Sequence, residues 1–229
     1  MKIGFTGIEL PEGKTKYQDA NLIALEKKDK PKKVSPFFAE FIRDEFIQCE
    51  AIVIPAANIL DLLILDMEKV EGRLTRLADG DEKTLIEKCL GKLEKEIPLC
   101  DGEFNEEENK ILRTTDFHSV KPVVKIEEGV EVNDIITLSL EKADYMFFYT
   151  SGPSESHAWL VQKGSDIITC AGKIHTDLAR GFIKGDVVAF DDYMSCHNFN
   201  ECKSKGLAKL TDRDYIVQPG EIIEIRFNV

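Results

Sequence analysis

The chain has 229 residues, which is enough for one large or two small domains with a buried core. Hydrophobic residues make up 43% and charged residues 31%, as in an ordinary soluble protein. The 42 acidic residues outnumber the 30 basic ones and give a formal net charge of -12, which argues against charge-driven nucleic-acid binding over the whole surface but not against a local basic face.

The first element in chain order is a predicted buried strand, Lys2 to Gly7, followed by part of a phosphate-binding motif. That motif needs a glycine, four residues and then Gly-Lys-Ser or Gly-Lys-Thr, so that backbone amides cradle phosphate while the lysine and hydroxyl reach phosphate and magnesium. Gly13-Lys14-Thr15 supplies its end, but Ile8 stands where the first glycine belongs. Two interpretations stay open: a bulged loop that still binds phosphate through Gly13, Lys14 and Thr15, or an inherited strand-turn-helix that no longer binds.

A helix, a basic run and two strands are predicted next. Tyr17 to Glu26 is a candidate helix, and Lys27 to Lys33 (KKDKPKK) is a charge run of the kind that usually forms a solvated linker. The apolar segments Val34 to Ile42 and Phe46 to Pro55 predict strands.

Residues 56–116 are predicted to form a helical hairpin. Apolar residues recur at three- and four-residue spacing along two seams, which are Leu60, Leu63, Met67, Val70, Leu74 and Leu77, then Leu85, Ile86, Cys89, Leu90, Leu93 and Ile97. Asn105 with Glu108 is a helix-start signature, and Lys121 to Ile126 predicts a return to the sheet. The hairpin can serve as a structural arm, a partner-docking arm, or both.

The last part of the chain predicts a small mixed β-grasp domain. Thr176 and Asp177 can cap a short helix, and Val187 to Phe190 is an apolar strand candidate. Gln218-Pro219-Gly220 predicts a turn just before a closing strand, Ile222 to Phe227.

These C-terminal segments resemble the TGS domain that closes proteins of the YchF subfamily of Obg-like P-loop NTPases. The matching segments are Ala171-Gly172-x-Ile174-His175-x-Asp177, Gly181-Phe182-Ile183, Asp214-Tyr215-Ile216-Val217-Gln218 and Arg226-Phe227-Asn228-Val229. Leu10-Pro11 and the hairpin are similar to the same family. The resemblance implies an α/β fold: a trimmed P-loop NTPase-like sheet over 1–55 and 117–141, an antiparallel helical hairpin inserted at 56–116, and a TGS β-grasp domain. The implied domains are 1–141 and 142–229.

The same resemblance implies positions for the nucleotide machinery, and most of them hold other residue types. The switch threonine position holds Phe38, the magnesium aspartate position holds Arg43, and the glycine-rich second switch has no counterpart. Glu128 and Glu131 fall on the base-binding Asn and Glu positions, and a carboxylate cannot supply an amide's paired donor and acceptor. Because phosphoryl transfer depends on positioning and charge stabilisation, we expect a poor catalyst.

Two functional hypotheses follow. The first is a non-catalytic or weakly catalytic YchF-like binding module, for which the resemblance implies the ribosome or RNA as partner. A local basic patch of Lys163, Lys173, His175, Arg180 and Lys184 is the candidate binding surface. The second is a working ATPase or GTPase that binds nucleotide and magnesium at Gly13, Lys14 and Thr15. The lost motifs favour the first hypothesis, so no catalytic residue is predicted.

The cysteines and histidines predict no metal site. Cys196, His197 and Cys202 form one loose group, whereas structural zinc sites show four ligands in tight pairs. His175 has no paired nucleophile or carboxylate at a telling spacing, which favours a turn-stabilising role. With scattered cysteines, no export signal and no membrane-length apolar stretch, we expect reduced thiols and a cytoplasmic protein.

Overall fold

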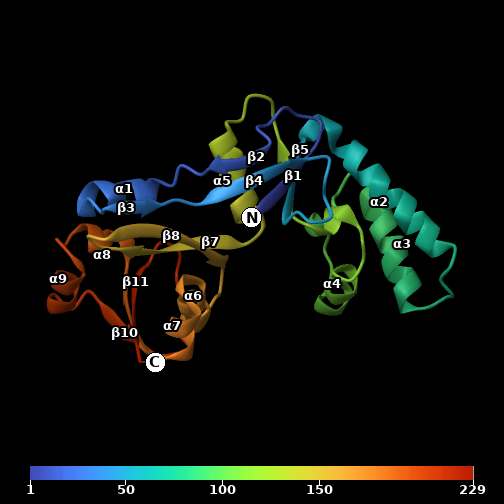
Figure 1. Ribbon diagram of the computed structural model, residues 1–229. Coiled ribbons are helices and arrows are strands. Elements are labelled where there is room, and N and C mark those ends of the chain that lie inside the picture. The colour runs from blue at the N-terminus through green and yellow to red at the C-terminus, as the bar shows by residue number, and fades with distance from the viewer. Residues whose placement is uncertain (229) are drawn as a thin grey trace. The chain divides into compact units, whose positions relative to one another are not determined.

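The computed structural model describes residues 1–228, and the chain forms two compact units (Figure 1). The first unit comprises residues 1–15 and 39–143. The second comprises residues 16–38 and the chain from residue 144 onward. The chain therefore enters the second unit early, leaves it, and returns to it after residue 143.

A five-stranded sheet forms the centre of the first unit, in the order β2-β4-β1-β5-β6. Its strands are β1 (Lys2–Phe5), β2 (Gly13–Lys16), β4 (Phe38–Arg43), β5 (Ala51–Pro55) and β6 (Val123–Ile126). β1 pairs in parallel with β4 and β5, and β5 pairs in parallel with β6. The central strands are apolar on both faces, as in a covered parallel sheet, and Ala51 to Ile54 are fully buried.

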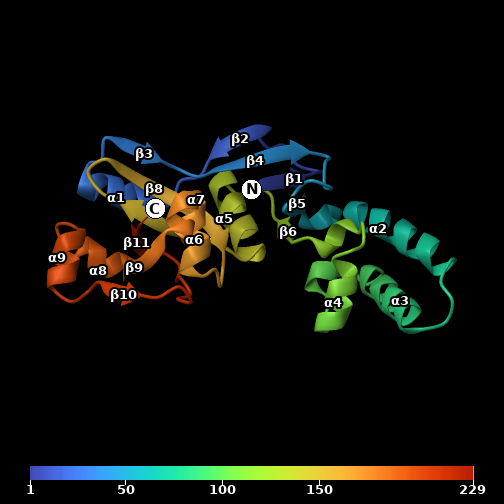
Figure 2. The same cartoon turned by 60° about the horizontal axis from the view of Figure 1, so that its bottom comes forward.

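The predicted helical hairpin is present in the first unit. The helices of this unit are α2 (Ile59–Leu74), α3 (Asp81–Leu93), α4 (Glu106–Leu112) and α5 (Val132–Lys142), and its 3-10 turns are Ala56–Asn58, Leu99–Asp101 and His118–Val120. α2 and α3 lie side by side and are joined at one end, so they run antiparallel (Figures 1 and 2). Leu63, Val70, Ile86 and Leu93 are fully buried along the seam between the helices and the core. Asn105 and Glu108 form a complete capping box at the start of α4.

A six-stranded mixed sheet forms the centre of the second unit, in the order β10-β9-β11-β7-β8-β3. Its strands are β3 (Lys33–Ser35), β7 (Tyr145–Ser151), β8 (Glu155–Gln162), β9 (Phe182–Val188), β10 (Lys209–Thr211) and β11 (Ile222–Phe227). Its helices are α1 (Ala20–Asp29), α6 (Ile167–Ile174), α7 (Thr176–Arg180), α8 (Phe190–Met194) and α9 (Phe199–Ser204). Along β7, Met146 and Phe148 pack with α6, while Phe147 and Tyr149 pack with α1, α8 and α9. The alternating side chains thus place a separate core on each face of the sheet.

Residues 16–38 differ from the predicted division of the chain, which placed them with the N-terminal sheet. Asp19 accepts hydrogen bonds from the N–H groups of Asn21 and Leu22, so α1 begins at Ala20, three residues later than the predicted helix. Leu22 and Leu25 are buried in the second unit's core, and β3 pairs in parallel with β8. Burial of this apolar helix face and the added strand account for the difference.

The predicted strand from Val34 to Ile42 is also two strands in the structure. β3 ends at Ser35 and belongs to the second sheet, whereas β4 begins at Phe38 and belongs to the first. Pro36 lies between them and lacks the N–H that a continuing ladder would need. The predicted mixed α/β architecture is otherwise confirmed, with a parallel sheet, a helical insertion and a second sheet.

Within residues 1–228, none of the helices is both long enough and apolar enough to cross a membrane.

Candidate functional site

The carboxyl ends of β1, β5 and β6 meet at one edge of the first sheet, where open parallel sheets commonly bind ligands. A cavity of about 200 Å³ lies there. Gly7 and Ile8 line one part of it, Asn58 another, and Glu127 and Glu128 a third. Within the described chain, this lining contains two glutamates and no lysine or arginine, so its net charge is negative.

Gly13, Lys14 and Thr15 lie in β2, at the edge of the sheet beside β4. Gly13 has φ +89°, and no helix begins at Lys14 or Thr15, because the next helix starts at Ala20. These residues are therefore part of an edge strand rather than a loop that leads directly into a helix. Nucleotide binding by the three residues stays a prediction.

Arg43, at the end of β4, forms hydrogen bonds with two acidic residues of the segment that precedes β2. Its Nε lies 2.9 Å from Glu12 Oε1, and its Nη2 lies 2.8 Å from Glu9 Oε2. A further bond of 3.2 Å from Nη1 to Glu9 Oε1 makes the pair with Glu9 bidentate. The guanidinium also lies 5.0 Å from the centre of the Phe5 ring. Hydrogen bonding to Arg43 lowers the pKa of the Glu9 carboxyl, so both partners are charged near neutral pH.

The other positions implied by the resemblance hold no conventional nucleotide contact. Phe38 is 47% exposed at the start of β4. Glu128 lines the acidic cavity, and Glu131 precedes the first turn of α5 without capping it through its side chain.

The five candidate partner-binding residues do not form an open basic patch. Ion pairs join Lys163 to Asp144 (3.9 Å), Arg180 to Asp177 (2.9 Å) and Lys184 to Asp212. His175 Nδ1 accepts a hydrogen bond of 3.1 Å from the Asp177 N–H and caps α7, which confirms the turn-stabilising role. Lys173 is exposed on α6. Acidic neighbours thus offset most of the positive charge on this surface, although its role in partner binding stays a prediction.

Cys196 follows α8 and Cys202 lies within α9, and both are buried thiols, whereas His197 between them is exposed. No group of three or more histidine, cysteine or acidic residues is arranged to hold a metal within the described part of the chain.

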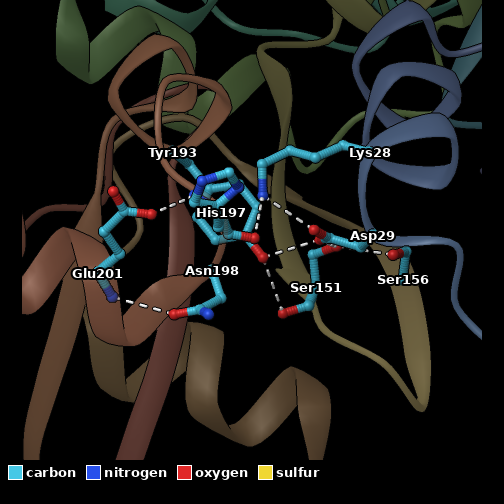
Figure 3. A network of polar contacts seen from close by, with 8 residues as sticks. All are labelled: Lys28, Asp29, Ser151, Ser156, Tyr193, His197, Asn198 and Glu201. Atoms are coloured by element: carbon cyan, nitrogen blue, oxygen red, sulfur yellow. Dashed lines mark hydrogen bonds and ion pairs between the residues drawn. The ribbon is translucent and has the colours of Figure 1, made fainter.

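A second and larger cavity, of about 440 Å³, lies in the second unit at the C-terminal end of α1. Lys28 and Asp29 from α1 meet Ser151 from β7 and Tyr193 from α8 in its wall (Figure 3). Sequence reasoning missed this site because Lys28 and Asp29 lie in the basic run that was assigned to a linker. The alternation of lysines with one acidic residue was the only signal in the sequence.

Comparisons with known proteins fit this geometry. The family model YchF-GTPase_C, described as a protein of unknown function (DUF933), matches residues 145–228. The solved structure of the Schizosaccharomyces pombe YchF GTPase superposes with a TM-score of 0.82 at 17% identity, over 99% of this chain and 97% of that chain. That likeness extends the shared fold over both units. The chain is thus similar to YchF and Obg-like ATPases, and its C-terminal part matches their family model.

Curated members of the YchF family align with different parts of the chain. The ribosome-binding ATPase YchF of Bacillus subtilis (strain 168) is 27% identical over 237 residues, covering 74% of this chain and 65% of that protein. Obg-like ATPase 1 of Rattus norvegicus is 42% identical over 82 residues, covering 36% of this chain and 21% of that protein. The matches thus span less than two thirds of these relatives' length. The C-terminal YchF TGS-like domain predicted from the sequence is confirmed.

Proposed function

We propose that this chain is a YchF-like binding module that docks on the ribosome or another RNA partner and has little or no nucleotide hydrolysis. Its site of action is the cytoplasm. The proposal combines a C-terminal domain that matches the family model over residues 145–228 with the residue types Phe38 and Arg43 at positions that the resemblance assigns to a threonine and an aspartate.

The observation that carries the proposal is the conformation of the segment from Gly7 to Lys16. A phosphate cradle needs successive backbone amides pointing inward and a helix that begins at the lysine and hydroxyl residues. Gly13, Lys14 and Thr15 instead extend β2. The guanidinium of Arg43, which stands at the magnesium aspartate position, is occupied by Glu9 and Glu12.

A magnesium nucleotide does not fit these residues. Two carboxylates, Glu127 and Glu128, line the cavity at the carboxyl edge of the sheet, where they would repel phosphate. A guanidinium at position 43 would repel the metal ion. ATP or GTP with magnesium remains the ligand of the alternative hypothesis, in which Gly13, Lys14 and Thr15 rearrange to form the loop.

Support for the partner comes from relatives and from the preserved domain. The Bacillus subtilis relative is named a ribosome-binding ATPase. Within this chain, the C-terminal region matches the family model, and this match supports binding as the retained activity.

Ribosome co-sedimentation of the full chain tests the proposal. We expect the chain to pellet with ribosomes at low salt, equally with no nucleotide, ATP or GTP. Lys14→Ala should pellet like the parent protein, because Lys14 is exposed on an edge strand. Absence of pelleting at low salt, or a strict requirement for magnesium nucleotide, would refute the proposal.

A further inference from the structure

The cavity at the end of α1 has the dimensions of a ligand site and is built from separate parts of the chain. Its volume of about 440 Å³ falls within the range of roughly 300–1,000 Å³ found for small-molecule pockets. Lys28 and Asp29 contribute from α1, Ser151 from the end of β7, and His197 and Asn200 from the segment around the start of α9.

A buried ion pair fixes the inner wall of this cavity (Figure 3). Asp29 Oδ1 accepts from Lys28 Nζ at 2.9 Å, while Oδ2 accepts from Ser151 Oγ at 2.6 Å and from the Tyr193 hydroxyl at 2.8 Å. The Asp29 side chain is only 6% exposed and that of Lys28 12%. Lys28 Nζ also donates to the His197 carbonyl at 3.3 Å and lies 3.9 Å from the centre of the Tyr193 ring. These bonds connect three segments and give the pocket a defined shape before any ligand binds.

The outer wall offers carboxamide and imidazole groups, and Glu224, which also lines the cavity, pairs with Lys203 at 2.8 Å. His197, Asn198 and Asn200 line the cavity and are exposed. Asn198 Oδ1 accepts from the Glu201 N–H at 3.0 Å, which holds that amide in place. Carboxamides and imidazole can donate and accept at the edges of an unpaired base, and an imidazole can also stack on its face.

Lysines flank this cavity along the chain. Lys27, Lys30 and Lys32 are exposed and form no ion pair within residues 1–228, whereas Lys33 pairs with Glu155. Lys30 has φ 46°, ends α1, and turns the chain towards the β7–β8 turn. There the Lys32 N–H donates to the Pro153 carbonyl at 3.1 Å, and Pro153 is itself part of the cavity wall. We call these three lysines the lysine rim, because Lys27 and Lys30 adjoin cavity-lining residues in the chain and Lys32 bonds to one.

We propose that this cavity and its lysine rim bind single-stranded RNA, with one unpaired base in the cavity and the flanking phosphates on Lys27, Lys30 and Lys32. The inference rests on the proposed function, whose RNA partner it assigns to a specific surface. A single strand fits because its bases can be splayed out, while a duplex keeps them stacked and paired. A protein with net charge -12 needs such a local cluster to approach RNA at all.

Fluorescence anisotropy of the full chain with labelled oligoadenylate and oligouridylate, over a salt series, tests the assignment. Replacing Lys27, Lys30 and Lys32 together with alanine should weaken binding and lower the slope of log affinity against log salt by about 2, or about 0.7 for each lost phosphate contact. A matched variant, Lys95→Ala with Lys110→Ala and Lys125→Ala, removes the same positive charge from exposed positions of the first unit and should keep that slope.

A second variant tests the cavity separately from the rim. Replacing His197 and Asn200 with alanine should weaken binding about tenfold through the loss of base contacts while the salt slope stays unchanged. Circular dichroism and thermal unfolding of each variant check that it is folded, since all of the altered positions are exposed.

The outcomes separate this inference from the proposed function. If the parent protein binds oligonucleotides and the rim and cavity variants bind equally well, the site is wrong but the RNA partner stands. If the matched variant loses as much binding and slope, the effect reflects net charge and the lysine rim is not the site. If mononucleotides bind while oligonucleotides do not, the polymer is not the ligand. If neither oligonucleotides nor ribosomes bind at low salt, both proposals fall.

Discussion

The positive charge of the Arg43 side chain determines which ions can bind at the end of β4. Arg43 forms two hydrogen bonds with Glu9 and one with Glu12, so ion pairs connect the segment before β2 to the end of β4. These pairs are exposed and contribute little stability, but they determine the electrostatics of the position.

Restoring an acidic residue at this position should not restore a metal site. We expect Arg43→Asp to show no magnesium-dependent affinity for ATP in calorimetry, because Gly13, Lys14 and Thr15 remain in β2 and Glu9 and Glu12 lose their partner. Arg43→Ala serves as the control. Tight magnesium-dependent binding by Arg43→Asp alone would show that the arginine was the main obstacle.

His118 makes the first unit sensitive to acid. Lys69 Nζ lies 3.1 Å from His118 Nε2, so this nitrogen accepts and the ring is neutral. Burial, followed by the charge of Lys69, lowers the pKa of His118 below its ordinary value of about 6.5. The folded state therefore binds this proton more weakly than the unfolded chain, and stability is lost as the pH falls through about 6.5 towards the folded pKa. His118→Gln, which keeps an acceptor for Lys69, should flatten this part of the pH dependence of thermal unfolding. An unchanged profile would show that His118 does not titrate in this way.

The conformation and the interaction partners of single residues were the hardest features to predict from the sequence. The motif at Gly13 to Thr15 was visible, but its strand conformation depends on pairing with β4. The basic character of Lys184 was visible too, although the acid that offsets it, Asp212, lies 28 residues further along the chain. Such partners are set by the folded topology and not by local spacing.

Among the elements, the hairpin gives the cleanest contrast between a buried and an exposed position. Leu63 is fully buried in the seam, whereas its neighbour Ile64 is 48% exposed. Leu63→Ala should reduce the free energy of unfolding by about 2–5 kcal/mol, and Ile64→Ala by no more than about 0.5 kcal/mol. Chemical denaturation followed by circular dichroism measures both. Equal losses would mean that the seam is not packed as described.

Elements with a strong internal pattern were predicted well. The closing strand was predicted as Ile222 to Phe227, and β11 has these bounds. Both hairpin helices and the capping box at Asn105 were also found. The prediction of one strand over Val34 to Ile42 was wrong because Pro36 interrupts the ladder, and an apolar segment alone does not show which sheet each part joins.

At the scale of the whole molecule, the claim with most consequence is that residues 16–38 belong to the second unit. Trp159, the chain's single tryptophan, lies in that unit and reports its unfolding by fluorescence. Leu25 is fully buried on α1, so Leu25→Ala should lower the midpoint of unfolding detected by fluorescence. We expect the free energy of unfolding to fall by about 2–5 kcal/mol.

The control for this prediction lies on the same helix. Ile23 is 37% exposed, so Ile23→Ala should leave the midpoint nearly unchanged. If Leu25→Ala behaved like Ile23→Ala, α1 would not be packed on this sheet. The sequence could not reveal this packing, because Leu25 and its core neighbour Val188 are far apart along the chain.

The central claim, that the chain binds partners without turning over nucleotide, is tested most directly by phosphate release from ATP and GTP with magnesium, in the presence and absence of ribosomes. We predict no release above the level of Lys14→Ala under any of these conditions. Magnesium-dependent release by the parent protein that disappears in Lys14→Ala would contradict the account, because it would require Gly13, Lys14 and Thr15 to leave β2 and form a working phosphate loop.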